Sequence, residues 1–218
     1  MSDLDQVYAN RFGETEHRAK LALWAEIVPA IGRLAPLDAP ILDLACDRGY
    51  FIANVAAGDR WASDIRDVSA DLPRDVRFVQ ASGLELDRHV APGSFATVFT
   101  SNYLEHLPSG EAVIEQLRVV RRLLRPGGRF VVLQPNIRLV GGAYWDFIDH
   151  HVALTERSLE EAGAIAGFAT ERMVVRFLPF TTKSRMPQDP RLVRAYLRFP
   201  PAWRILGKQT LSVGRAPS

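Results

Sequence analysis

The stretch "ILDLACDRGYF", residues 41–51, indicates the fold class of this chain. An apolar run reaches Asp43, a tight turn follows, and Gly49 opens a segment with a helical pattern. A strand, a turn and a helix in this order are typical of nucleotide-binding folds, whose turn is usually rich in glycine. Ala45 and Asp47 stand at two places where glycine is usual. The stretch therefore predicts a cofactor loop and raises the question whether the loop keeps its shape.

Length and composition favour one soluble globular domain. The chain has 218 residues, of which 47% are apolar and 24% charged, enough for one sizeable core. No apolar run approaches the roughly 20 residues that cross a bilayer, and the polar, acidic N-terminus is unlike a signal peptide. Cys46 is the only cysteine, which excludes an internal disulfide and a cysteine-based zinc site. We therefore expect a cytoplasmic protein.

Strands alternate with helices along the chain. Helices are predicted at 14–34, 49–57, 109–125, 155–167 and 190–198, and strands at 40–45, 60–65, 76–81, 95–102, 129–134, 171–178 and 209–215. This alternation predicts an α/β fold with a doubly wound, mostly parallel sheet and helices on both faces. Ligands of such sheets bind beyond the carboxyl ends of the strands, where the strand order reverses.

Mostly small or polar residues lie at or just beyond the predicted strand ends, as a ligand site at that edge requires. They are Asp43, Ala45, Cys46, Asp47 and Gly49 at the first strand and its loop, Asp64 with apolar Ile65 at the end of the second strand, Ser82 and Gly83 after the third, Ser101 and Asn102 at the end of the fourth, and Asn136 after the fifth.

Several motifs in the right order resemble class I S-adenosylmethionine-dependent methyltransferases, in particular their small-molecule branch (the type 11, 12 and 23 families). The resemblance spans about residues 38–178. It rests on "ILDLACDRGYF", on Asp64 placed 21 residues after Asp43, and on "FVQASGLEL", "FATVFTSNYLEHL", "LLRPGGRFVV" and "HHVALTERSLEEAGAIAGF". It implies a Rossmann-like, seven-stranded sheet with an antiparallel last strand. The expected single methyltransferase domain comprises an N-terminal helical segment (1–37), a cofactor-binding core (38–178), a basic insertion rich in proline and aromatic residues (179–208) and a final strand (209–215).

The resemblance also implies S-adenosyl-L-methionine as cofactor, bound by the residues after the first four strands. Asp64 would accept both ribose hydroxyls, and Ser82 stands where the family commonly has an adenine-contacting Asp. S-adenosylmethionine carries no phosphate, which relaxes the need for glycine in the loop. Asp47 would contact the methionine moiety or, alternatively, cap the following helix. An acidic residue with a left-handed backbone is tolerated at such a position.

Candidate catalytic residues are His151, His150, Glu105 and His106. Histidine titrates near neutrality and is the commonest general base, and the resemblance places His151 near the substrate. His151 would be the base or a substrate contact or, alternatively, would only form a hydrogen bond to the backbone. Glu105 and His106 could move a proton or hold a metal, but two ligands do not make a metal site, so no metal is expected.

The acceptor is expected to be a small molecule, with a sugar or glycan precursor that carries phosphate as the favoured class. Candidate substrate contacts are Asn136, Tyr144, Trp145, Lys183 and Arg185. From Arg176 onward the sequence has nine basic residues and one acidic residue, Asp189. This excess of positive charge suits contact with an anionic membrane surface or, alternatively, only a solvated helix. Nucleic acid is a weaker expectation, because "SNYL" (101–104) is not the aromatic motif of RNA methyltransferases. A second interpretation is an inactive methyltransferase-like partner subunit. The oligomeric state is left open.

Overall fold

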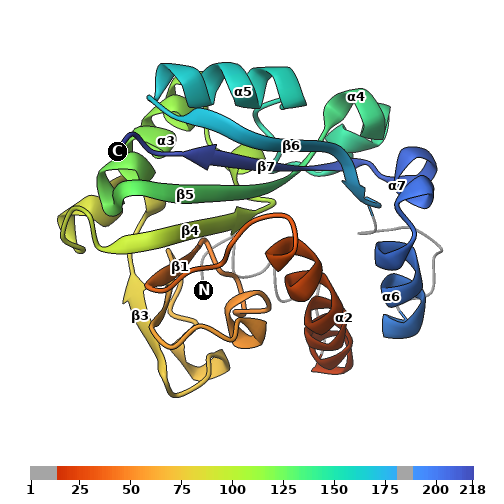
Figure 1. Cartoon of the computed structure of the whole chain (residues 1–218), viewed down its shortest axis with the longest axis horizontal. Coiled ribbons are helices and arrows are strands. Elements are labelled where there is room, and N and C mark those ends of the chain that lie inside the picture. Colours follow the sequence, from red (N-terminus) through yellow and green to blue (C-terminus); the bar gives the residue numbers. More distant parts are fainter. Residues whose placement is uncertain (1–13, 181–188) are drawn as a thin grey trace.

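A computed structural model describes residues 14–180 and 189–218 and contains a seven-stranded sheet in the order β3-β2-β1-β4-β5-β7-β6 (Figure 1). The strands are β1 Ile41–Leu44, β2 Arg60–Asp64, β3 Val76–Gln80, β4 Phe95–Ser101, β5 Leu124–Pro135, β6 Ala169–Leu178 and β7 Gln209–Arg215. β1 to β5 are mutually parallel, and β7 runs antiparallel to both β5 and β6. The predicted Rossmann-like sheet with an antiparallel last strand is confirmed.

Helices and short 3-10 turns connect the strands. The α-helices are α2 Glu14–Gly32, α3 Gly110–Leu123, α4 Ile137–Val140, α5 Glu156–Ile165, α6 Pro190–Arg198 and α7 Pro200–Leu206. The 3-10 helices are η1 Ile52–Asn54, η2 Ser69–Asp71, η3 Gly83–Arg88, η4 Leu104–His106 and η5 Gly141–Asp146. None of the helices in the described ranges has the length and apolar character that a bilayer crossing requires.

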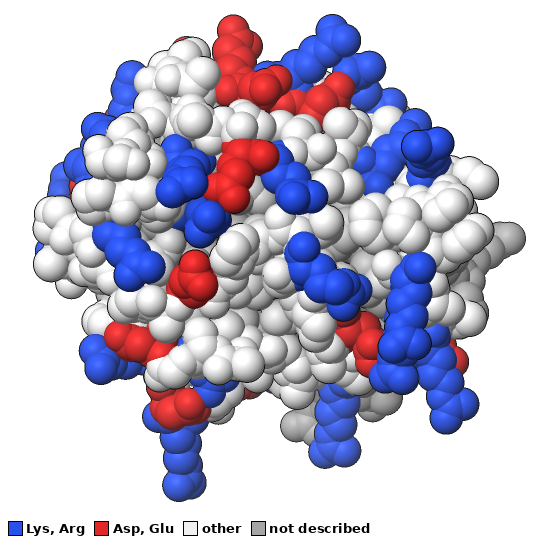
Figure 2. Space-filling view, viewed as in Figure 1, with Lys and Arg blue, Asp and Glu red and all other residues white. Residues whose placement is uncertain are grey.

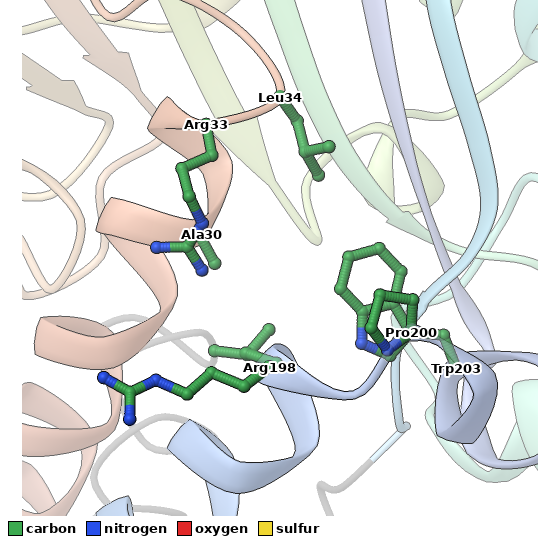
Figure 3. Close-up of a pocket in the computed structure, with 7 residues that line it drawn as sticks. Ala30, Arg33, Leu34, Arg198, Pro200 and Trp203 are labelled. Atoms are coloured by element: carbon green, nitrogen blue, oxygen red, sulfur yellow. The ribbon is translucent and has the colours of Figure 1, made fainter.

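Helix α6 packs beside α2, and α7 packs against α6 and β6. Arg194 of α6 forms an ion pair with Glu26 of α2, and Lys and Arg side chains gather over this corner of the molecule (Figure 2). A shallow cavity between α2, α6 and α7 is lined by Ala30, Arg33, Arg198 and Trp203 among others (Figure 3). None of its lining residues belongs to the predicted cofactor site.

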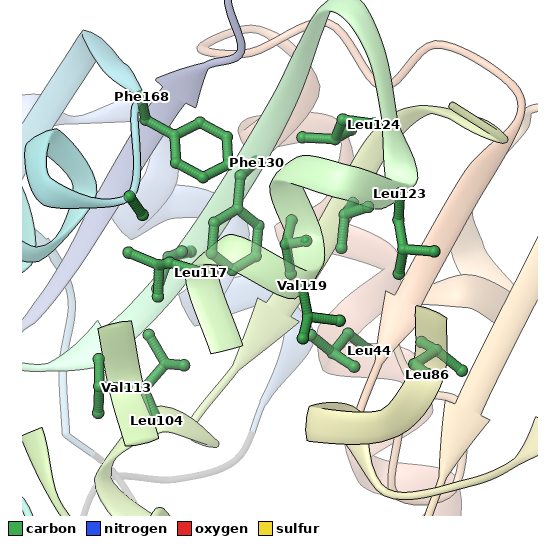
Figure 4. Packing of buried hydrophobic residues seen from close by; sticks show 14 of the residues in the cluster. Leu44, Leu86, Leu104, Val113, Leu117, Val119, Leu123, Leu124, Phe130 and Phe168 are labelled. Carbon is green, nitrogen blue, oxygen red and sulfur yellow. The ribbon is translucent and has the colours of Figure 1, made fainter. Parts of the chain in front are cut away.

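Alternate residues of the central strands face two separate cores, one on each side of the sheet. Leu42 of β1 packs with α3 and α5, in the cluster drawn in Figure 4, whereas its neighbour Ile41 packs with α2. Phe130 and Val131 of β5 divide in the same way. This period of two is the pattern of a strand covered on both faces, so the sheet is the middle layer of three.

Local capping defines the helices that cover the first core. The Ser109 side chain accepts from the Ala112 amide at the start of α3, and Thr155 forms a reciprocal capping box with Ser158 at the start of α5. Each cap satisfies an amide that would otherwise lack a partner. The predicted start of α5 at Thr155 is confirmed.

Three predicted elements need correction. The helix expected at 49–57 is only the short η1, because the Arg60 guanidinium takes the carbonyls of Ile52 and Val55 that a longer helix would use. The strand β5 begins at Leu124 rather than 129, because Leu124 already pairs with Phe95 and the "PGG" turn is an irregularity within the strand. The helix α7 was not predicted; its two prolines occupy the first turn, where no amide donor is needed.

Candidate active site

The first loop lies where the strand order reverses. β1 is flanked by β2 on one side and β4 on the other, so the loop after Leu44 lies at the reversal point predicted for a ligand. The backbone φ angles of Ala45, Asp47 and Gly49 are 57°, 50° and 71°. All three residues therefore adopt the left-handed conformation that glycine favours. The loop keeps the shape of a glycine-rich turn without two of its glycines.

Gly49 is the one position of the three where an added side chain would have to displace a neighbour. A Cβ atom built there would lie 2.3 Å from Cδ2 of Leu72, in addition to the backbone strain of the positive φ. The contact with Leu72 therefore adds to the backbone preference for glycine at position 49.

Asp43 and Cys46 are buried inside the loop. The Asp43 carboxylate accepts a hydrogen bond of 3.3 Å from the Ile52 amide, and burial raises the pKa of this carboxyl well above its usual range. Cys46 is 5% exposed, and burial also raises the pKa of its thiol, which fits a packing residue rather than a nucleophile. Asp43 thus ties β1 to η1 and orients the loop between them.

Asp64 and Asp47 are held together by an arginine that the sequence motifs did not reveal. Asp64 accepts from the Asp47 amide (3.0 Å), the Arg66 amide (3.0 Å) and Nε of Arg66 (3.2 Å). Nη2 of Arg66 also donates to the Asp47 carboxylate at 2.8 Å. Asp47 therefore neither caps a helix nor points only to solvent. The chain position of Arg66, two residues after Asp64, is the only sequence signal for this bridge.

The remaining cofactor candidates lie along the same edge. Ile65 is 61% exposed beside Asp64, where its apolar side chain is available to a flat ring. Ser82 precedes η3, and Asn102 after β4 has a φ of 47°. Gly83 has a packing role, because a Cβ there would lie 2.5 Å from the Tyr103 hydroxyl. Ser101 is the last residue of β4 and is half-buried.

A second group of polar residues surrounds Glu105, directly after β4. The Glu105 side chain is fully buried, and its Oε2 accepts from Nε2 of Gln134 at 2.8 Å. Its Oε1 is buried with no hydrogen-bond partner among the described residues. Burial raises the pKa of Glu105, against the opposing effects of His106 and the Gln134 hydrogen bond.

Two histidines lie beside this carboxylate. Nε2 of His106 is 4.0 Å from Oε1 of Glu105, and Nδ1 of His106 is 2.8 Å from the backbone oxygen of Asp149. The ring of His150 contacts that of His106 at a centroid distance of 5.0 Å and is only 9% exposed. The structure thus brings together three of the four predicted catalytic residues.

His151 lies next to this group with its side chain exposed. Its amide donates to the Glu105 carbonyl at 2.8 Å, and the Val152 amide donates to the same oxygen at 3.1 Å. These two bonds fasten the segment 144–152 over the carboxyl end of β4. This long-range contact determines that His150 is buried and His151 exposed. The positions of the two adjacent histidines in the sequence could not predict it.

The candidate substrate residues divide between structural and exposed positions. Asn136 is 1% exposed; its amide group donates to Glu156 and Thr210, and its oxygen caps α4. Tyr144 is fully buried, and its hydroxyl donates to the Val152 carbonyl at 2.6 Å. Both side chains are engaged in contacts within the fold, and their role as substrate contacts stays a prediction. Trp145 is 51% exposed and remains a candidate, and Lys183 and Arg185 lie outside the described residues.

The chain matches a known protein family over most of its length. Residues 15–172 match the family model Methyltransf_23, described as a methyltransferase domain. A search of curated proteins gives no match.

Solved structures share the fold at low identity. A methyltransferase in complex with the Trm112 methyltransferase activator, from Haloferax volcanii, is 18% identical, with a TM-score of 0.64 over 89% of this chain and 90% of that one. An S-adenosylmethionine-dependent methyltransferase from Mesorhizobium loti is 20% identical, with a TM-score of 0.63 over 88% and 97%. One from Archaeoglobus fulgidus is 16% identical, with a TM-score of 0.62 over 88% and 94%.

The residues at the strand edge fit the cofactor of this family. A left-handed loop lies at the reversal point, the carboxylate of Asp64 ends β2, and exposed Ile65 is the next residue. These are the groups that an amino acid, a ribose and an adenine ring require. The chain belongs to the methyltransferase-domain family and is an S-adenosylmethionine-dependent methyltransferase of the class I fold.

Proposed function

We propose that the enzyme methylates an oxygen or nitrogen of a small-molecule acceptor at the edge between β1 and β4. The observation that carries this proposal is the pair of hydrogen bonds from His151 and Val152 to the Glu105 carbonyl. They hold a segment rich in aromatic residues and histidine beside the end of β4, whose neighbour β1 leads into the cofactor loop. S-adenosylmethionine supplies the methyl group as an electrophile, and the chain supplies alignment and a proton acceptor.

Asp64 is the proposed ribose ligand. Its carboxylate is 7% exposed and has two backbone donors and one side chain, Arg66, around it. The backbone donors keep the carboxylate in place, whereas the Arg66 side chain can rotate away and leave Oδ1 to a ribose hydroxyl. Ile65 would cover the adenine ring, with Ser82 at the ring edge. Asp43 acts through the loop rather than on the cofactor.

The substitution Asp64→Asn tests this assignment by calorimetric titration with S-adenosylmethionine. A hydrogen bond to a charged group contributes about 1.5–3 kcal/mol, so loss of the charge is expected to weaken binding about 10- to 100-fold. Asp67→Asn is the matched control, since Asp67 is exposed and bonds only to Ser69 among the described residues. Equal affinity of Asp64→Asn and the wild type would refute the role of Asp64.

His151 is the proposed proton acceptor. Its exposed side chain can receive a proton from an acceptor hydroxyl or amine and release it to water. His151→Ala is expected to lower kcat about 100-fold at neutral pH and to leave cofactor affinity unchanged. Full turnover of this variant would remove His151 from the mechanism.

The proposed acceptor class is a sugar or glycan precursor that carries phosphate. Trp145 offers an exposed aromatic face at the edge of the site, and Phe147 and Phe180 contact each other at 6.0 Å nearby. Aromatic faces stack on sugar rings, and the basic residues Lys183 and Arg185 follow Phe180 in the sequence. A radiolabel transfer screen should give higher turnover with sugar phosphates and nucleotide sugars than with the matching free sugars. Turnover only on unphosphorylated compounds would refute the phosphate preference.

The alternative is an inactive partner subunit. The Haloferax volcanii methyltransferase, which has this fold, forms a complex with a methyltransferase activator. This complex is the observation that favours a protein partner for the present chain. The altered glycines, Ser82 and Ala96 are the sequence features that support inactivity, and the loop shape counts against the first of them, because Ala45 and Asp47 take the left-handed conformation. Absence of both heat and thermal shift with S-adenosylmethionine would favour the partner role.

We further propose that α6 and α7 contact an anionic membrane surface from the cytoplasmic side. Leu192, Phe199, Ile205 and Leu206 are 50%, 60%, 78% and 40% exposed. Arg191 directly precedes Leu192, and Arg198 and Arg204 directly precede Phe199 and Ile205 in the sequence. Exposed apolar side chains with interspersed cations suit an interface with anionic lipid.

Sedimentation with vesicles tests the membrane proposal. The protein is expected to bind vesicles with anionic phosphatidylglycerol but not pure phosphatidylcholine, and Phe199→Ser with Ile205→Ser should abolish binding. Ile165→Ser on α5, which removes an equally exposed apolar residue elsewhere, should have no effect. Equal binding to neutral vesicles, or to RNA with a steep salt dependence, would refute the proposal.

A further inference from the structure

Glu105, His106 and His150 form a compact group of possible metal ligands. One ligand atom from each residue lies within 4.8 Å of the other two. Glu105 and His106 are adjacent in η4, whereas His150 comes from the segment after η5, 44 residues further along the chain. The fold thus adds a third ligand to a pair that would not suffice by itself.

The hydrogen bond of His106 leaves its other nitrogen able to bind a metal. A carbonyl oxygen can only accept, so Nδ1 of His106 carries the proton that bonds to the Asp149 oxygen at 2.8 Å. In the neutral ring, Nε2 then has its lone pair available, and Nε2 is the atom that faces Oε1 of Glu105. A backbone carbonyl that holds the remote nitrogen is the usual support of a metal-binding histidine.

Glu105 supplies the second observation that points to a ligand. Its side chain is fully buried, and Gln134 fixes only Oε2, while Oε1 has no hydrogen-bond partner among the described residues. A buried carboxylate oxygen without a donor is costly, and a cation between Oε1 and the imidazoles would satisfy it.

We propose that Glu105, His106 and His150 bind one divalent transition-metal ion of the zinc type. Two imidazoles and one carboxylate match the ligands of zinc and non-haem iron, whereas Mg²⁺ prefers oxygen ligands alone. Ligand atoms about 2.0–2.2 Å from a tetrahedral zinc lie about 3.4 Å apart, so the side chains need to close by about 1 Å. If the proposed function holds, an open coordination position would take the acceptor oxygen; metal binding itself does not depend on it.

Titration of the chelator-treated full chain with Zn²⁺, followed by calorimetry, tests the site. We expect one equivalent of Zn²⁺ to bind and Mg²⁺ at the same concentration not to bind. Co²⁺ in the same site is expected to show the visible absorption of a low-coordinate ion with nitrogen ligands. His106→Asn and His150→Asn are each expected to lower Zn²⁺ affinity at least about 100-fold, beyond the 10- to 100-fold typical of supporting residues.

Two other histidines provide matched controls. His89→Asn and His151→Asn remove exposed imidazoles, one remote and one adjacent, and are expected to keep the wild-type affinity. Circular dichroism of each variant shows whether it is folded, and the Co²⁺ spectrum of the wild type reports on the site should a variant fail to fold. Absence of Zn²⁺ binding by the wild type, a Co²⁺ spectrum of the hydrated ion, or unchanged affinity in folded His106→Asn and His150→Asn would overturn the proposal.

Discussion

The replacement Ala45→Gly should stabilise the enzyme, because Ala45 holds a left-handed backbone that glycine adopts without strain. The φ of 57° costs an L-residue about 1–2 kcal/mol. Glycine loses about 0.4–1 kcal/mol more than alanine through the greater freedom of its unfolded chain. The difference predicts a gain of about 0.5–1 kcal/mol in the free energy of unfolding, which corresponds to a rise in Tm of about 2–3 °C for a chain of this size.

The opposite replacement at the end of the same loop should destabilise it. Gly49→Ala introduces the same backbone strain at a φ of 71° and also displaces the Leu72 side chain, which a Cβ would approach to 2.3 Å. With about 1 kcal/mol for that displacement, the expected loss is about 2 kcal/mol. Gly58→Ala is the control, since a Cβ there meets nothing within 4 Å and the chain should gain up to about 1 kcal/mol.

Equilibrium unfolding in urea, followed by circular dichroism, measures all three variants, and equal m-values would show that the unfolded states are comparable. The reasoning is refuted if Ala45→Gly is less stable than the wild type by about 1 kcal/mol, the size of the strain that the substitution should relieve, or if Gly49→Ala is as stable as the wild type.

Three further outcomes follow from the packing. Glu105→Gln should be more stable than the wild type in chelator at pH 8 and lose this advantage near pH 4. Because the pKa of Glu105 is raised in the folded state, its contribution to stability is present below the pKa of the unfolded chain and is lost as the pH rises through the pKa of the folded chain. Urea unfolding at several pH values measures this difference. Thr155→Ala should cost about 1 kcal/mol by loss of the α5 cap, and an unchanged urea midpoint would contradict it. Arg194→Ala should change the stability by less than about 1 kcal/mol despite its ion pair with Glu26, because Arg194 is exposed; a loss above about 2 kcal/mol in urea would contradict this.

The elements whose residues carry a local signal could be predicted from the sequence. A short, largely apolar run marked β4, and the apolar spacing of α3 and the Thr155 cap marked two helices, because these patterns depend on neighbours within a few positions. The helix expected at 49–57 failed for the converse reason: the group that ends it, the Arg60 guanidinium, arrives from the next strand.

The order of strands in the sequence was enough to place Asp43, Asp64 and Asn102 at one edge of the sheet, since a parallel sheet brings the carboxyl ends of its strands together. The contacts that these side chains make could be seen only in the folded chain. The left-handed backbone at Ala45, the Arg66 bridge between two carboxylates and the burial of His150 rather than His151 all depend on contacts between segments far apart in the chain. Residue spacing cannot reveal such contacts, because they form only when strands and loops pack together.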